Sequence, residues 1–315
     1  MCVPLTQIPK ALGLIPNNSH NQFTVNGQLY ALGIIQVAFA MRYDKRILKQ
    51  AGYNGPPTSL DEWLAITKAV TKPPKQFGND LLNTVAAGAD WWNALQNFCL
   101  LYDGAWAKGK TLTINSPENV KGLEFWLEIV NASGLKGSSE AVILKLSYSD
   151  QIAMMFDVSL GASTLKAEAP KLYPNLATAA PPWPNRKAIS RLHPVVVLKS
   201  SKNQDAAMEL AKWMITPKNL WYVTQQNGYP ICPYTNFGKF IPQYNAFEKS
   251  LPWYTGFQTT NYVGESDIFG DYTFAYAQFG NIIQGNLEKA ISGSSTVKEA
   301  LDASQTQAQT SLPKP

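Results

Sequence analysis

The chain has 315 residues, of which 45% are hydrophobic and 16% are charged. This length predicts two lobes or one large α/β unit and excludes a single small module. The hydrophobic fraction is enough for a sizeable core, which excludes a disordered chain or a coiled coil. Lys and Arg number 27 against 22 Asp and Glu, giving a net charge of +5. Because the basic residues are scattered, nucleic acid is not an expected partner.

In chain order, capping residues, hydrophobic spacing and turn residues predict an alternation of strands and helices. The elements are a strand at 28–40, a helix at 60–70, a strand at 111–115, a helix at 117–131, a strand at 152–157, a proline-rich loop at 179–187, a strand at 195–199, two consecutive helices between 203 and 228, and a closing helix from 296. This alternation favours an α/β fold with largely parallel sheets and crossover helices.

The helix starts carry the clearest local signals. Ser59 and Glu62 form a capping box, and Thr296 and Glu299 form a second one. Ser116-Pro117 supplies an N-cap followed by proline at the first helical position. These signals predict where helices begin more sharply than hydrophobic spacing does.

The cysteines and the chain's start bear on redox state and targeting. Cys2, Cys99 and Cys232 are an odd number without C-x-x-C spacing, which encodes neither a disulfide framework nor a zinc site. We expect them to be small buried hydrophobes.

The weakly charged stretch 29–41 is shorter than the ~20 residues of a membrane span. No secretion signal is visible in residues 1–10, which indicates a cytoplasmic chain or one that has lost its front end.

Residues 104–111 match the P-loop string letter for letter. A P-loop needs a strand before it and a helix after it, so that backbone amides cradle phosphate. Here residues 92–101 have a helical pattern and 111–114 alternate like a strand. We therefore predict a turn at Lys108-Gly109 that joins two short strands, rather than a nucleotide site.

Catalytic patterns are sparse. His20 and His193 are far apart in sequence, no G-x-S-x-G elbow accompanies them, and we expect structural roles for both and no metal site. The carboxylates Glu265, Asp267 and Asp271 lie in an aromatic stretch. They are candidates for acid–base work on a glycosidic bond or for contact with a ligand.

Aromatic residues are abundant, with 9 Trp, 14 Tyr and 13 Phe. Flat rings beside amide and carboxyl side chains suit sugars, whose C–H faces pack on aromatics while their hydroxyls form hydrogen bonds. The pair Trp91-Trp92, flanked by Asp90 and Asn93, is the best candidate for such a platform. Most other rings are expected to belong to the core.

Several segments, taken in order, resemble the sugar-specific family of extracellular solute-binding proteins that includes maltose-binding protein. The segments that carry the likeness are 26–32, 42–45, 50–52, 56–63, 113–126, 152–155, 200–209, 216–217, 228–230 and 296–303. Their order along 26–303 is more specific than any single string. The resemblance implies a two-lobe fold of type II, in which crossing strands join two α/β lobes and a ligand is held between them.

Carried onto this chain, the resemblance divides it at expected crossings near 30–36, 191–195 and 233–242. Residues 1–30 and 193–240 would be the remnant of lobe 1, and residues 31–192 and 241–315 would form lobe 2. The family's opening segment, signal peptide and lipid-bearing cysteine have no counterpart here, so we expect an N-terminally truncated chain with a poorly covered sheet in lobe 1. The full-length form would be periplasmic or extracellular and tethered to the membrane.

The resemblance also implies ligand-binding positions. Gln36 follows the first crossing, Trp91 and Trp92 with Asp90 match an aromatic-rich helix entry, and Asp157 with Ser159 follows the Met-bearing strand. Tyr229 and Tyr262 are weaker candidates. The usual aromatic platform is absent, since Leu160 and Gly161 stand in its place.

The expected function is a monomeric sugar receptor that needs no cofactor, closes around a carbohydrate and docks on the membrane permease of an ATP-driven importer. Two alternatives stay open. One is a glycoside-processing enzyme with an aromatic-lined cleft. The other is the same receptor fold with a polyamine, an anion or a metal as its cargo.

Overall fold

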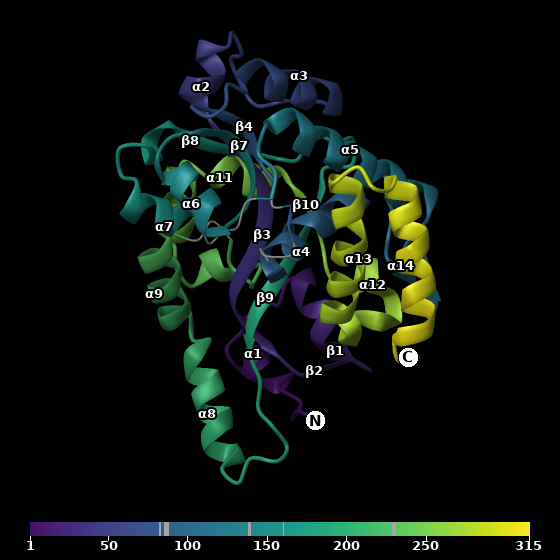
Figure 1. Ribbon diagram of the computed structural model, residues 1–315. Coiled ribbons are helices and arrows are strands. Elements are labelled where there is room, and N and C mark those ends of the chain that lie inside the picture. The colour runs from purple at the N-terminus through teal and green to yellow at the C-terminus, as the bar shows by residue number, and fades with distance from the viewer. Residues whose placement is uncertain (82, 85–87, 138–139, 160, 229–230) are drawn as a thin grey trace.

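The computed structural model describes residues 1–81, 83–84, 88–137, 140–159, 161–228 and 231–315 (Figure 1). One mixed sheet crosses the molecule in the order β10-β9-β3-β7-β4, and β8 also pairs with β3. These strands are β3 (Leu32–Asp44), β4 (Phe77–Asp80), β7 (Ile152–Val158), β8 (Leu176–Ala179), β9 (Lys187–Val195) and β10 (Asn261–Val263).

The long strand β3 organises the sheet. It pairs antiparallel with β7, β8 and β9, whereas among the described strands only β4 with β7 and β10 with β9 are parallel. The prediction of largely parallel sheets is therefore wrong. Alternation along the sequence does not say which strands become neighbours, and the strands beside β3 all return in the opposite direction.

The strand predicted at 195–199 is also wrong. The strand is β9, which ends at Val195, and beyond it only Leu198 forms an isolated bridge, with Cys2. An apolar run has high strand propensity, but a strand also needs a partner with which to pair. The loop predicted at 179–187 is confirmed between β8 and β9.

The predicted helices are confirmed. They are α3 (Leu60–Val70), α5 (Pro117–Ser133), α8 (Gln204–Met214), α9 (Pro217–Asn227) and α14 (Val297–Ser311). The other helices are α1 (Gln7–Ala11), α2 (Lys45–Gln50), α4 (Gly88–Leu95), α6 (Glu140–Tyr148), α7 (Gly161–Glu168), α10 (Tyr244–Ser250), α11 (Tyr254–Thr259), α12 (Ser266–Phe269) and α13 (Tyr276–Ile291). Five 3-10 segments are described: η1 (Asn18–Phe23), η3 (Gln96–Tyr102), η4 (Tyr173–Asn175), η5 (Phe237–Lys239) and η6 (Gly270–Ala275). None of the helices in the described part of the chain has the length and apolar character that a bilayer crossing requires.

The two faces of β3 bury different sets of side chains, because successive residues of a strand point to opposite sides. Phe39 and Met41 join the main core, which α3, α4, α5, α13 and α14 cover. Ala38 and Ala40 pack on the other face against residues of α7 and α11. We call the part of the molecule built on these cores the larger body.

A smaller body has its own core. Leu5, Ile8 and Leu14 pack with residues of α8 and α9 and with Tyr244 of α10. The short hairpin of β1 (Thr24–Val25) and β2 (Gln28–Leu29) belongs here. Helix α8 projects away from the rest of the chain (Figure 1), and its Leu210 and Trp213 are 56% and 61% exposed. Part of this body's apolar surface is therefore exposed to solvent.

The two bodies are joined where β3 and β9 pair, from Leu32 opposite Val195 to Ala38 opposite Ser190. These strands coincide with the first two expected crossings. The third, near 233–242, contains a β-bridge between Pro16 and Tyr234 and the 3-10 turn η5. Gly33, at a bulge of β3, lies so close to Leu192, Pro233 and His20 that a Cβ there would sit 3.0–3.1 Å from each of them.

The P-loop string forms a hairpin. Strands β5 (Ala107–Lys108) and β6 (Thr111–Leu112) pair antiparallel. Gly109 lies between them with a φ of +55°, a conformation that favours glycine. The predicted turn between two short strands is confirmed.

Candidate functional site

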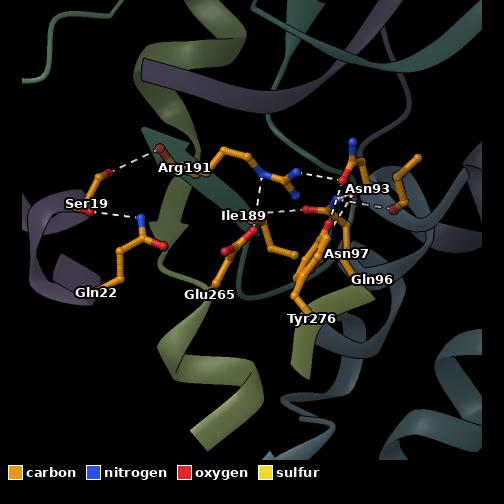
Figure 2. Close-up of polar contacts among 11 residues, drawn as sticks. Ser19, Gln22, Asn93, Gln96, Asn97, Ile189, Arg191, Glu265 and Tyr276 are labelled. Carbon is orange, nitrogen blue, oxygen red and sulfur yellow. Dashed lines mark hydrogen bonds and ion pairs between the residues drawn. The ribbon is translucent and has the colours of Figure 1, made fainter. Parts of the chain in front are cut away.

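Arg191 is the centre of a polar cluster near the junction of the two bodies. Figure 2 shows its side chain extending from β9 toward Asn93 of α4, with Glu265 and Tyr276 beside it. The guanidinium donates to Asn93 Oδ1 over 2.6 Å through Nη1, and its Nε lies 3.4 Å from Glu265 Oε1. The guanidinium carbon also lies 5.5 Å from the centroid of the Tyr276 ring, a cation–π distance.

The cluster forms because α4 and η3 present a stripe of amides. Asn93, Gln96 and Asn97 are three and four residues apart, so they face the same side of a helical segment. Gln96 Nε2 donates to the Tyr276 hydroxyl over 2.7 Å, and the Ile189 amide donates to Asn97 Oδ1 over 2.7 Å. These amides fix both Tyr276 and β9 against α4.

The guanidinium of Arg191 does not use all of its hydrogen-bond donors. Its Nε and Nη2 are buried and have no hydrogen-bond acceptor among the described residues, although Glu265 pairs with its charge. Burial raises the pKa of Glu265, and the nearby Arg191 opposes that rise. Burial likewise raises the pKa of the Tyr276 hydroxyl. The Glu265 carboxylate therefore offsets much of the cost of burying this cation.

A cavity of about 300 Å³ adjoins this cluster. Asn93 belongs to both, because it lines the cavity and accepts from Arg191. Asp90 and Asp157, two of the predicted ligand residues, also line it. Asp157 pairs with Arg42 over 3.3 Å, and burial raises its pKa against the opposing effect of Arg42.

The predicted residues Gln36 and Tyr262 lie at another cavity, of about 480 Å³, which includes residues of both bodies. Gln36 is already bonded there: it accepts from Asn17 Nδ2 over 2.6 Å and donates to Ser190 Oγ over 2.7 Å and Ser19 Oγ over 3.2 Å. Its side chain therefore connects the two bodies and has little capacity left for a ligand.

Trp91 and Trp92 are core residues, which corrects their prediction as a platform for a ligand. They are 0% and 2% exposed. Trp91 stacks on Trp126 with centroids 6.0 Å apart, and Trp92 packs on Trp106 and on Tyr276. The reason is that α4 turns its apolar face into the larger body. The Trp92 ring packs against the Tyr276 ring from within the core.

Two further predicted ligand residues, Ser159 and Tyr262, lie outside the Arg191 cluster. Ser159 is fully buried, and its hydroxyl donates to the Gln36 carbonyl over 3.1 Å, which joins β7 to β3. It is therefore not accessible to a ligand. The Tyr262 hydroxyl donates to the Phe39 carbonyl over 3.3 Å, and burial raises its pKa. Tyr229 lies outside the described residues.

The three candidate carboxylates lie in three different environments. Glu265 belongs to the Arg191 cluster, Asp267 lines the larger cavity and accepts from the Gly264 amide, and Asp271 is exposed. His20 has the expected structural role, since its Nε2 accepts from the Gly33 amide. Cys99 and Cys232 are buried and Cys2 is half-buried. Within the described ranges, no three His, Cys, Asp or Glu side chains lie together as a metal site would need.

Sequence reasoning missed the roles of Arg191, Gln96 and Tyr276. A signal existed for part of the cluster, because Asn93, Gln96 and Asn97 interrupt an apolar helical segment at helical spacing. For Arg191 the sequence offers no such signal, since its partners come from α4, from α13 and from the residue that precedes α12.

The overall fold is that of two-lobe solute-binding proteins. The ABC transporter solute-binding protein of Thermotoga lettingae TMO, solved with α-D-tagatose, superposes with a TM-score of 0.80 at 18% identity, over 97% of this chain and 79% of that one. The GacH receptor of Streptomyces glaucescens GLA.O, solved with acarbose, gives 0.80 at 18% identity over 98% and 78%. Maltose-bound MalE3 of T. maritima gives 0.75 at 17% identity over 98% and 80%.

The chain belongs to the family of bacterial extracellular solute-binding proteins, whose family model matches residues 1–236. A binding protein of Brucella abortus (strain 2308) is 22% identical over 217 residues, which make up 65% of this chain and 51% of that relative. The chain thus spans about half the length of the curated relatives that it matches.

Proposed function

We propose that this chain is the substrate-binding component of an ABC importer and that it binds a carbohydrate between its two bodies. The observation that carries the proposal is the cluster near the junction of the two bodies, in which Arg191, Asn93 and Glu265 place polar groups beside the ring of Tyr276. Sugar hydroxyls accept from such donors, and an aromatic ring suits the C–H face of a sugar. The three sugar-bound structural neighbours are consistent with this ligand class.

In this proposal each residue of the cluster has a role. Arg191 donates to a ligand oxygen, Glu265 accepts from a hydroxyl, and Tyr276 supplies a ring surface. Asp90 and Asp157 contact the part of the ligand nearest their cavity. Contacts from lobe 1 come from the 480 Å³ cavity, which includes residues of both bodies and is lined by Asn18 and Asn21.

The rest of the proposal concerns the whole protein. Residues 1–30 and 193–240 form lobe 1, and 31–192 with 241–315 form lobe 2, with Tyr244 of the second set also packing in the smaller core. Ligand contacts from both lobes stabilise the closed state to the extent that the open state lacks them. The closed monomer then delivers its ligand to a membrane permease, in the periplasm or outside the cell, from a full-length form that is tethered to the membrane.

Isothermal titration calorimetry tests the ligand class. The panel is tagatose, maltose, acarbose and mannitol, with spermidine and inorganic phosphate representing other cargo. We expect binding of at least one carbohydrate, and about 10- to 100-fold weaker binding by Arg191→Gln, because a hydrogen bond from a charged donor contributes roughly 1.5–3 kcal/mol. Arg46→Gln is the matched control, since Arg46 is 44% exposed and pairs with Asp150 outside the cluster.

Two results would contradict the proposal. One is binding of spermidine or phosphate alone, and the other is unchanged carbohydrate affinity in Arg191→Gln. Tyr276→Ala removes the ring that packs on the sugar and provides a second variant, also with weaker carbohydrate binding expected, if Arg191→Gln does not fold. Chromatography of the titrated oligosaccharides tests the enzyme alternative, because a hydrolase would release products from maltose or acarbose.

A further inference from the structure

The 300 Å³ cavity next to the Arg191 cluster has mostly apolar walls. It lies inside the larger body among α4, α6, α7 and β7. Its apolar lining includes Phe39, Leu144, Tyr148, Phe156 and Leu165. A cavity of about 150 Å³ lined by such residues is enough to hold benzene, so this one has room for an aromatic ring or a branched alkyl group.

The charges on the cavity floor satisfy one another. Arg42 Nε lies 3.3 Å from Asp157 Oδ2, and Arg42 Nη2 donates to Ser147 Oγ over 2.8 Å. The other oxygen of Asp157 accepts from the Val158 amide over 2.7 Å. Asp90, the remaining charged lining residue, is exposed and marks the solvent side. The interior therefore presents no unpaired charge, and a charged group placed there would be desolvated without a partner.

Asn93 belongs to both the cavity and the Arg191 cluster. Its Oδ1 accepts from Arg191 and from the Tyr276 hydroxyl, while the same residue lines the cavity. A ligand that contacts Asn93 therefore has the Arg191 cluster on one side and the apolar cavity on the other. The polar cluster and the apolar cavity together fit an amphiphilic ligand.

We propose that the ligand of this protein is a glycoside with an uncharged apolar substituent, aryl or branched alkyl, and that this substituent occupies the cavity among α4, α6 and α7. The inference rests on the proposed carbohydrate binding and goes further by naming the substrate class. Binding of the substituent transfers apolar surface from water to Phe39, Leu144 and Phe156, which stabilises the complex in proportion to the area buried.

Matched pairs of methyl and phenyl β-glycosides of glucose, galactose and mannose test the proposal by calorimetry. For any sugar that binds, we expect the phenyl glycoside to bind about tenfold or more tightly than the methyl glycoside. Equal affinities of a pair in the native chain would overturn the proposal, and this comparison needs no variant.

A variant that fills the cavity tests whether the phenyl group binds there. Leu144 is half-buried on α6, and Leu144→Trp should fill the cavity, remove the advantage of the phenyl glycoside and leave the affinity for the methyl glycoside unchanged. Val142→Trp is the matched control, because Val142 lies on the same helix, is 46% exposed and does not line the cavity. A phenyl advantage that persists in Leu144→Trp would place the substituent elsewhere and refute the assignment.

Benzyl alcohol separates this inference from the proposed function. If no glycoside binds, carbohydrate binding has failed, and the cavity is tested with benzyl alcohol alone by ligand-observed NMR. Saturation transfer in the native chain that Leu144→Trp abolishes would support the apolar site, with another polar group attached to the ligand. Absence of transfer in the native chain would refute the cavity assignment as well.

Discussion

Asp80 is a buried carboxyl at the end of β4, and both of its oxygens lack hydrogen-bond partners among the described residues. Burial raises its pKa to about 7, the nearby Arg42 opposes the rise and Asp157 adds to it. Because Arg42 already pairs with Asp157, the larger body accommodates Asp80 better as a neutral acid than as an anion.

A carboxyl whose pKa is raised by folding holds its proton more tightly in the folded chain. Its contribution to stability is therefore present below the unfolded pKa, near 4, and is lost as the pH rises through about 7. We predict that the free energy of unfolding falls between pH 5 and pH 8. The fall should be smaller in Asp80→Asn by a few kcal/mol, since one pKa unit corresponds to about 1.4 kcal/mol.

Urea unfolding at the two pH values measures this difference. Glu248, whose pKa burial also raises to about 7, is present in both proteins, so its effect cancels in the comparison. The expectation fails if native protein and Asp80→Asn lose the same stability between pH 5 and pH 8.

At the scale of single elements, α14 shows how local signals act on a packed helix. The Thr296 hydroxyl accepts from the Glu299 amide over 3.1 Å, and the Glu299 carboxylate accepts from the Thr296 amide over 2.8 Å. The helix buries Val297, Ala300 and Leu301 against the main core. The cap therefore fixes the start of a helix that tertiary packing also needs.

Thr296→Ala should lower the free energy of unfolding by about 0.5–2 kcal/mol, because it leaves amides of the first turn without an acceptor. Chemical denaturation followed by circular dichroism measures it. Thr306→Ala on the same helix is the control, since Thr306 is exposed and, within the described ranges, its hydroxyl bonds to the Asp302 carbonyl alone. A cost at Thr296 no larger than at Thr306 would show that the cap contributes nothing.

At the scale of the whole molecule, Gln36 links parts of the chain that are distant in sequence. Its side chain bonds to Asn17 and Ser19 of the smaller body and to Ser190 of β9. Ser159 adds a bond to the Gln36 carbonyl from β7. The junction of the two bodies is therefore held by a buried polar network as well as by strand pairing.

Replacing Gln36 with Met keeps the size of the side chain and removes its hydrogen bonds. We predict a loss of about 1–3 kcal/mol in unfolding free energy, because Asn17 and Ser190 lose buried partners. Amide hydrogen exchange should accelerate first along the paired segments of β3 and β9. Gln309→Met, on the exposed side of α14, is the control, and equal exchange patterns in the two variants would rule out a role for Gln36 at the junction.

The sequence by itself determined the helix starts at Ser59, Ser116 and Thr296, the turn at Lys108-Gly109 and the family resemblance, because each depends on neighbouring residues or on order along the chain. Only the tertiary structure decided that β3 has antiparallel neighbours, that Trp91 and Trp92 are buried, and that Gln36 is already bonded. The Arg191 cluster belongs to this second group. Its partners come from α4, from α13 and from the start of α12, and local spacing carries no information about which distant side chains a fold will bring to one strand.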